Sequence, residues 1–455
     1  MVSDLRAIPS VDAVLGALAG EGEWPHTLAV EAVRGVIASA REEAQAGGPL
    51  PSLDTIVGQA QVAVAQLARP SLRPVINATG VILQTNLGRA PLSERALQAM
   101  AEAGRGYTNL EFDIAEGDRG SRHDHVRELI RRTTGAEEGL VVNNNAAALL
   151  MVLQVFASGS GVIVSRGEAV EIGGRFRIPD VLRQSGAQLV EVGTTNRTYA
   201  EDYADAIDEG TAALLRVHRS NFQITGFTAQ PALAELVALA RQRAVLLLDD
   251  LGSGCLVETA DFGIAHEPTV QESLDAGVDL ALFSGDKLLG GPQCGVIAGR
   301  GALVEQLRQH PLARALRVDK LTIAALNATL MAYVAGTERD EIPVWRMLAL
   351  EGEALRTRAE VWARAAGPRG RLVPSESMIG GGSLPGAGRP TWCAALRSEH
   401  GADWLAGQLR GADPAILGRL QDDEVLLDPR TVAESEGGTV AACIAALVGS
   451  EGGDA

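Results

Sequence analysis

Lysine is the rarest charged residue in this chain, and this rarity suggests chemistry. Of 40 lysine and arginine residues only Lys287 and Lys320 are lysine, which leaves 38 arginines. Arginine carries a positive charge as well as lysine does, but it cannot easily lose a proton or form an imine. The two lysines are therefore candidates for positions where an amine must react.

Lys287 is the stronger candidate. It follows Ser-Gly-Asp in a turn between two short apolar runs, in LALFSGDKLLGGPQCGVIAG. Burial there lowers the pKa of a lysine because the ammonium loses its hydration, and imine chemistry needs the neutral amine. The alternative is a solvated surface charge, which the flanking apolar runs disfavour. Lys320, in HPLARALRVDKLTIAAL, lies at the start of a predicted helix among other bases and is the weaker candidate.

Two further polar clusters follow predicted strands. In VVNNNAAALLMVL, Asn143, Asn144 and Asn145 lead into a helix whose free N–H groups could bind a phosphate, although an ordinary asparagine cap explains the pattern as well. In AVLLLDDLGSG, a buried strand ends on Asp249 and Asp250. Adjacent strand residues face opposite sides, so one of the two could hold a protonated ring nitrogen or a metal. A cap or loop carboxylate is the alternative.

The order of these three features along the chain suits pyridoxal 5'-phosphate. The helix N-terminus would bind the phosphate, the aspartate the pyridine nitrogen, and the lysine the aldehyde. Each feature is weak alone. Together they favour an enzyme of the aspartate-aminotransferase-like class, fold type I.

The elements that must position these residues are short apolar runs separated by helical segments, over about residues 71–340. Runs without polar alternation indicate strands buried on both faces of a mostly parallel sheet, whose ligands lie beyond the carboxyl ends of the strands. We therefore predict a large α/β catalytic domain. The predicted strands are Gly139–Val142, Val162–Ser165, Gln188–Val192, Ala212–Val217, Ala244–Asp249, Leu280–Phe283 and Gly295–Ala298.

Two smaller domains are predicted on either side. Residues 1–70 contain three amphipathic helical stretches, VDAVLGALAG, HTLAVEAVRGVIASAREEAQ and LDTIVGQAQVAVAQLA, typical of a docking domain. Residues 341–455 combine a glycine-rich stretch, IGGGSLPGAGRP, with short apolar runs (TWCAAL, EVLLD) and helical stretches (WLAGQLR, VAACIAALV). These features predict a small C-terminal α/β domain.

Composition excludes several classes of function. The four cysteines contain no CxxC pair, so neither a zinc site nor a disulfide framework is expected, and we predict no metal. A net charge of −17 argues against non-specific binding to DNA. The longest apolar stretch, 146–157, is too short to span a membrane, and MVSDLRAIPS lacks the features of a secretion signal. A cytoplasmic protein is expected.

The sequence also resembles a known family, the bacterial selenocysteine synthases or L-seryl-tRNA(Sec) selenium transferases. The resemblance runs from about Arg73 to the end. The motifs that carry it are INATGVILQTNLGRAPLS, GYTNLEFDIAEGDRGSR, VVNNNAAALL, SRGEAVEIGGRFRIPD, EVGTTNRT, DLGSG, SGDKLLGGPQCG, HPLARALRVDKLT, IGGGSLPG and LLDPRTV. Two small departures, Cys294 and Pro429 where Ala and Leu are expected, affect no catalytic role. The N-terminal helices fit the family's extra domain, a candidate for tRNA binding.

The resemblance implies a role for particular residues. Lys287 is expected to form the imine with the cofactor, and Asp250, with Asp249 facing away, to bind the ring nitrogen. The phosphate-binding positions match Asn144, Asn145, Ala146 and Ser284. The basic cluster for the selenium donor matches Arg89, Arg314 and Arg317, since guanidinium groups grip compact oxyanions bidentately. Two further expected cofactor contacts are His218 and Asn221.

The resemblance further implies the reaction. L-seryl-tRNA(Sec) is converted to L-selenocysteinyl-tRNA(Sec), with selenophosphate as donor, through a dehydroalanyl (aminoacrylyl) intermediate. Lys287 acts as the base for the α-hydrogen. A ring-shaped homodecamer is implied as well.

The net negative charge of the chain disfavours binding of tRNA, which is itself a polyanion. Residues 1–70 hold four basic and eight acidic residues, so tRNA contacts would have to come from local arginine clusters such as RELIRR. Two other functions stay open. One is a related lyase acting on a free small amino acid or amino sugar acid, although such a substrate needs no N-terminal extension. The other is a non-catalytic tRNA-binding relative, which the intact Lys287, Asp250 and Ser284 disfavour.

Overall fold

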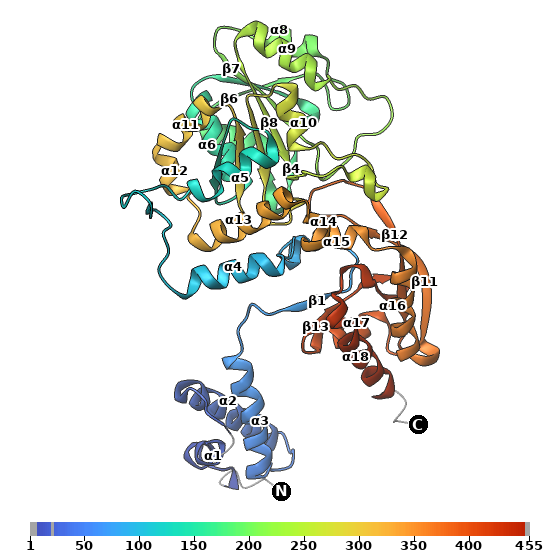
Figure 1. Cartoon of the computed structure of the whole chain (residues 1–455). Helices are drawn as coiled ribbons and strands as arrows, with labels where there is room; N and C mark the ends of the chain where they lie inside the picture. Colours follow the sequence, from blue (N-terminus) through green and yellow to red (C-terminus); the bar gives the residue numbers. More distant parts are fainter. Residues whose placement is uncertain (1–6, 20–21, 451–455) are drawn as a thin grey trace. The chain divides into compact units, whose positions relative to one another are not determined.

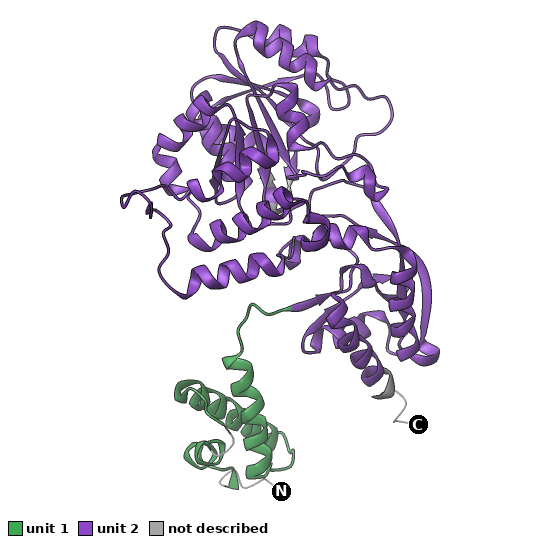
Figure 2. Ribbon diagram, in the orientation of Figure 1, with its two compact units in different colours: residues 1–74 green, residues 75–455 purple. Residues whose placement is uncertain are grey.

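The chain divides into two compact units, residues 1–74 and 75–455, which are described separately (Figure 2). The structure, a computed structural model, describes residues 7–19 and 22–450, without the side chains of 172, 174, 176 and 448–450. No helix in this described part combines the length and apolar character that crossing a membrane requires.

The first unit is a bundle of three helices, α1 (Val11–Leu18), α2 (His26–Gln45) and α3 (Leu53–Ala68). Helices α1 and α3 begin where the side chains of Ser10 and Ser52 accept hydrogen bonds from the backbone of the first turn. Apolar residues at helical spacing, among them Val14, Val33 and Ile56, meet in one core. The three predicted helices are confirmed, although Gly20, at the end of the first, lies outside the described residues.

The second unit is built on a seven-stranded sheet (Figure 1). The strand order is β2-β10-β9-β8-β7-β3-β6, and only β10, among these described strands, runs antiparallel to its neighbours. All seven predicted strands are confirmed. The bounds are β2 (Glu138–Val142), β3 (Gly161–Ser165), β6 (Gln188–Val192), β7 (Thr211–Val217), β8 (Leu246–Gly252), β9 (Leu280–Ser284) and β10 (Gly295–Gly299).

Helices cover both faces of this sheet. One face packs on α6 (Asn145–Ala157), α7 (Ile178–Ser185) and α11 (Gly301–Gln309) through a core of Leu, Val and Ala side chains. The other face packs on α5 (Asp124–Thr134) and α13 (Lys320–Ala335). Burial from both sides explains why the strands show no polar alternation. The other helices of this part are α4 (Glu94–Arg105), α8 (Ala200–Ala206), α9 (Leu233–Arg243), α10 (Val270–Ala276), α12 (Pro311–Ala315), α14 (Glu338–Glu341) and α15 (Pro343–Ala349).

A smaller antiparallel sheet follows, in the order β11-β12-β15-β14. Its strands are β11 (Gly370–Met378), β12 (Gly388–Leu396), β14 (Arg419–Gln421) and β15 (Glu424–Leu427), and its helices are α16 (Gly352–Ala365), α17 (Ala402–Gly411) and α18 (Gly437–Ser450). The chain enters this region early, because β1 (Val75–Asn77) pairs in parallel with β13 (Ala415–Leu417). Residues 75–455 form one compact unit, so the division near residue 340 stays a prediction.

Candidate active site

The two adjacent acids of strand β8 lie on opposite faces of the sheet. Asp249 accepts a hydrogen bond from Ser273 Oγ at 2.6 Å and lies 3.5 Å from a guanidinium nitrogen of Arg216. Asp250 instead accepts a hydrogen bond from Asn145 Nδ2 at 2.7 Å. The strand runs on to Gly252, not to Asp249 as predicted, so the pleat fixes the direction of both acids. Burial raises the pKa of Asp250 to about 6, and the charge of Lys287 and the Asn145 hydrogen bond oppose this shift.

Lys287 is buried on the turn after strand β9. Its side chain is 4 % exposed, and Nζ donates a hydrogen bond to the carbonyl oxygen of Gly382 at 3.3 Å. Burial lowers the pKa of Lys287 below its ordinary value, and the nearby charge of Arg89 lowers it further. The structure therefore places a weakly basic amine within electrostatic reach of Asp250.

Glycines leave room in front of this amine. A methyl group on Gly252 would lie 3.7 Å from Lys287 Nζ, and one on Gly382 would lie 3.3 Å from it. Both glycines adopt a positive φ, which side-chain-bearing residues rarely do. Gly382 belongs to the glycine-rich stretch predicted in the C-terminal region, so that stretch forms one wall around Lys287.

Several buried polar atoms near the amine and the carboxylate lack a hydrogen-bond partner among the described residues. They are Asn145 Oδ1, Ser253 Oγ and Ser383 Oγ. The residues that carry them adjoin the pair: Asn145 Nδ2 donates to Asp250, the backbone oxygen of Ser253 accepts a hydrogen bond from Leu288, which follows Lys287, and Ser383 follows Gly382. Unpaired buried polar groups are costly, and they are expected where a polar ligand binds.

The N-terminus of helix α6 lies beside this cluster. Asn144 is its cap, because its Oδ1 accepts a hydrogen bond from the N–H of Ala147 at 2.9 Å. The side chain of Asn144 is thus an ordinary helix cap, the alternative given for this pattern in the sequence. The first-turn N–H groups of Asn145 and Ala146 have no partner within the helix. Gly295 of β10 packs against the Asn144 backbone so closely that a side chain would collide with it. Ser284, the last residue of β9, is buried next to this strand.

The predicted donor-binding arginines are placed differently from one another. Arg89 pairs with Asp286, the neighbour of Lys287, at 2.7 Å. Arg317 is 39 % exposed, 3.8 Å from Glu111, and it lines a cavity of about 570 Å³ together with Asp286. Arg314 is exposed on α12 and does not line this cavity. The structure therefore brings Arg89 and Arg317 to the surroundings of Asp286, but not Arg314.

The two further expected contacts also differ. His218 lies at the end of β7, beside Asp250. The exposed Asn221 uses its Nδ2 to donate to the backbone oxygen of Glu171 at 2.8 Å. Sequence reasoning missed the Gly382 carbonyl, the Asp286 carboxylate and Ser253. Asp286 adjoins the lysine in SGDK, so the ion pair with an arginine was the one contact that the sequence could have suggested.

A buried amine, a facing carboxylate and a helix N-terminus meet at the carboxyl ends of a mostly parallel sheet. This arrangement defines the predicted aspartate-aminotransferase-like class, fold type I, and the unpartnered polar atoms fit pyridoxal phosphate. A solved structure with the same fold is D-glucosaminate-6-phosphate ammonia-lyase, with a TM-score of 0.60 at 22% identity over 86% of this chain and 99% of that chain.

Sequence comparison gives the family. The profile of the L-seryl-tRNA selenium transferase family matches residues 75–433. The L-seryl-tRNA(Sec) selenium transferase of Moorella thermoacetica is 47% identical over 98% of this chain and 97% of its own. The protein of the same name from Geobacter metallireducens is 47% identical over 97% of this chain and 98% of its own. The chain belongs to the L-seryl-tRNA selenium transferase family, as its motifs predicted.

Proposed function

We propose that the protein is a pyridoxal-phosphate-dependent enzyme that converts L-seryl-tRNA(Sec) to L-selenocysteinyl-tRNA(Sec) with selenophosphate. The observation that carries this proposal is the buried pair of Lys287 and Asp250, in a chain that aligns over nearly its whole length with transferases of that name. The alternative, a lyase for a free amino acid or amino sugar acid, shares the fold. The alignment favours the transferase because 98% of this chain, which must include most of residues 1–74, aligns with one.

The residues around the pair would hold the cofactor. Asn144, Asn145, Ala146 and Ser284 would receive its phosphate, and Asp250 its ring nitrogen. A ring held in this way withdraws electrons from the α-carbon of the bound serine. Asp250 would keep the ring nitrogen protonated, since a carboxylate that is expensive to bury is stabilised by a cation beside it.

Lys287 would act twice through Nζ. Its lowered pKa makes the neutral amine accessible, so Nζ can bond covalently to the cofactor. With the substrate in place, Nζ would accept the serine α-hydrogen as a proton. The β-hydroxyl would leave with a proton as water, and selenium would add to the β-carbon as the P–Se bond of selenophosphate is broken and its phosphate passes to water.

The selenium donor would be bound by Arg89, Arg314 and Arg317. Arg89 has a φ of 65°, in the left-handed region that favours glycine. The ion pair with Asp286 holds it there, beside Lys287. Strained backbone of this kind is often retained where a side chain must be aimed. Selenophosphate is a compact oxyanion that guanidinium groups bind bidentately.

We also propose that the chain assembles into a homo-oligomer, a ring-shaped decamer. Three apolar side chains in one loop, Tyr107, Phe112 and Ile114, are at least half exposed. Apolar groups gathered on a surface are typical of protein–protein contacts. A cytoplasmic location is proposed as well, which a tRNA substrate supports.

The decisive experiment is turnover of seryl-tRNA(Sec) with selenophosphate, run beside seryl-tRNA(Ser). Selenium should be incorporated only into the former. Equal turnover of both tRNAs would contradict the proposed specificity. No turnover of either, together with elimination from a free amino acid or an amino sugar acid, would favour the lyase.

A further inference from the structure

A second buried carboxylate, Glu267, lies close to the Lys287–Asp250 pair. It is 2 % exposed, and its Oε1 lies 3.2 Å from Nε2 of His218. The contact between these two atoms is an ion pair, and neither atom has a hydrogen-bond partner within the described chain. A buried carboxylate is costly unless it is paired, so this side chain needs the imidazole beside it.

The loop between β8 and α10 is built to hold Glu267 inward. The hydroxyl of Thr259 accepts a hydrogen bond from the N–H of Glu267 at 2.9 Å and donates one to the oxygen of Ala265 at 2.7 Å. These two bonds tie the start of the loop to the residues on either side of His266. The inward direction of Glu267 is therefore fixed by the backbone.

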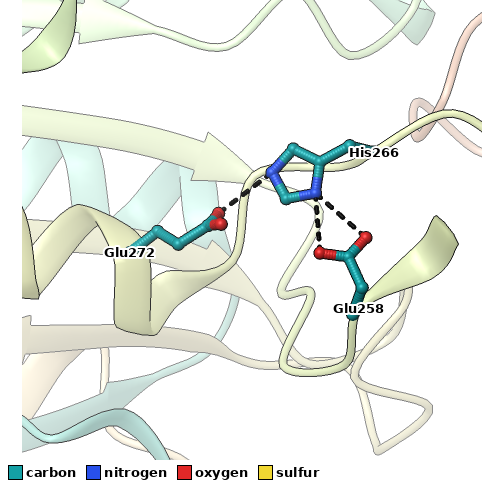
Figure 3. Close-up of side chains that lie close together, drawn as sticks. All are labelled: Glu258, His266 and Glu272. Carbon is teal, nitrogen blue, oxygen red and sulfur yellow. Dashed lines mark hydrogen bonds and ion pairs between the residues drawn. The ribbon is translucent and has the colours of Figure 1, made fainter. Parts of the chain in front are cut away.

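The outer side of the same loop is held by His266 (Figure 3). Its Nδ1 lies 3.0 Å from Glu258, and its Nε2 lies 3.1 Å from Glu272. These carboxylates raise the pKa of His266, Glu258 most, which favours the imidazolium. Because the two ring nitrogens face separate carboxylates, the three groups form a charged clamp on the outer side of the loop.

His218 connects Glu267 to the reacting groups. Its backbone N–H donates to the backbone oxygen of Asp250 at 2.9 Å. A positive charge on His218 would lower the pKa of Asp250, and the charge of Glu267 raises the pKa of Lys287. Glu267, His218, Asp250 and Lys287 thus form one electrostatically connected group.

We propose that Glu267 is a positioning residue that orients the imidazole of His218 toward the bound cofactor. A carboxylate can only accept, so the hydrogen of the imidazole must lie on Nε2 and that edge of the ring is turned to Glu267. The other nitrogen and the ring face are left for the cofactor. This inference rests on the proposed cofactor role of the site, but not on the identity of the tRNA or of the selenium donor.

The first test uses the protein without cofactor and measures the tautomer of His218 by ¹⁵N NMR, with the signal assigned from a His218→Gln variant. In the wild type, hydrogen should lie on Nε2. Glu267→Met, which keeps the volume but cannot accept, should lose this preference, whereas Glu267→Gln, whose amide oxygen can accept, should keep it. Asp261→Asn is the matched control, because Asp261 lies on the same loop and pairs outward with Arg339. An unchanged tautomer in Glu267→Met would overturn the proposal.

The second test is a double-mutant cycle on the enzyme with cofactor. Glu267→Met should lower kcat by about 10- to 100-fold, the cost of a misplaced group, with little change in KM. In a His218→Gln background, Glu267→Met should lower kcat no further, since Glu267 acts only through His218. If the kcat reductions of Glu267→Met and His218→Gln multiplied in the double variant, the proposal would be overturned. If the wild type fails to turn over seryl-tRNA(Sec), the proposed function fails, while the tautomer measurement still decides the role of Glu267.

Discussion

The two halves of the proposed site differ in how they are built. The cofactor half is buried, with Lys287 and Asp250 4 % and 6 % exposed, and each side chain points at named partners. The donor half is open: Arg317 is 39 % exposed, and Arg314 lies on the surface outside the cavity that Arg317 lines. The groups proposed to hold the cofactor are enclosed, whereas the groups proposed to bind a charged donor are in contact with water.

This difference reflects opposite demands. Burial shifts the pKa values of Lys287 and Asp250, which an exposed position could not do. Arginine stays charged almost anywhere, so its grip on an oxyanion needs no burial, and it must be accessible to a ligand that comes and goes. Substitutions in the two halves should therefore fail in different ways.

The largest effect is expected at Lys287. Lys287→Ala should lower turnover by on the order of 10⁴-fold or more, because it removes both the covalent attachment of the cofactor and the proton acceptor. Borohydride reduction followed by mass spectrometry should fix the cofactor on Lys287 in the wild type. Lys320→Arg is the control: Lys320 donates to the oxygen of Gly106 at 2.7 Å, and arginine can do the same. Cofactor fixed on Lys320 would contradict the assignment.

A smaller effect is expected at Asp250, and it should contrast with Asp249. Asp250→Asn should still bind cofactor but slow exchange of the seryl α-hydrogen by about 10²- to 10³-fold, since a preorganised charge is lost. Asp249→Asn weakens a buried pairing with Arg216 and Ser273, so it should lower stability while folded enzyme keeps its exchange rate. NMR measurement of α-hydrogen exchange detects the effect of Asp250→Asn, and thermal unfolding detects the effect of Asp249→Asn. Near-normal exchange in Asp250→Asn would point to another ring partner.

The sequence predicts the cofactor half well, for physical reasons. A strand buried on both faces has no polar alternation, so each predicted run appears in the sheet, with bounds that differ by a few residues. The pleat separates Asp249 from Asp250 without any knowledge of tertiary structure. The rarity of lysine and the apolar runs around it were enough to predict the burial of Lys287.

Other features required the folded chain. The carbonyl of Gly382 is a backbone group almost a hundred residues from Lys287, and no side-chain pattern in the sequence predicts their contact. Asn145 was expected at the phosphate, yet its side chain binds Asp250, because direction at a helix start depends on the neighbouring strand. Arg314 and Arg317 lie in similar sequence contexts, and only the folded structure shows that Arg317 lines the cavity and Arg314 does not.

Substitutions in the donor half should spare the earlier chemistry. Arg317→Ala should raise the KM for selenophosphate by about 10- to 100-fold, the worth of one charged hydrogen bond or pair, while serine is still consumed. Arg317→Lys should recover little of this loss, because an ammonium cannot reproduce the bidentate fork. Arg364→Ala, at an exposed pair with Glu360, is the control.

Packing is the alternative role for these arginines, and oligomer size distinguishes it. If Arg314 and Arg317 only pack between subunits, their variants should lose assembly, and any assembled enzyme should keep its saturation by selenophosphate. A fully assembled Arg317→Ala variant with an unchanged KM for selenophosphate would contradict the assignment of Arg317 to the donor. The two arginines should also differ in size of effect, with Arg317 the more sensitive, because it lines the cavity with Asp286.

The smallest effect is on stability, and it tests burial in the cofactor half directly. Asp250 has a pKa of about 6 in the folded protein, against an ordinary value of 3.8. Between these values the folded state holds the proton more tightly than the unfolded state, so the free energy of unfolding should fall as pH rises from about 4 to about 6, and the penalty should be complete above that range. Asp250→Asn removes this titration. Urea unfolding of the cofactor-free protein should therefore show a difference in the free energy of unfolding between variant and wild type that grows with pH and then levels off.

Glu168, buried with a pKa raised to about 7, supplies the comparison: in Glu168→Gln the corresponding difference in the free energy of unfolding should level off at higher pH. Parallel stability curves for wild type and Asp250→Asn would show that the carboxyl of Asp250 is in contact with water, and the contrast between the enclosed and the open half would fail.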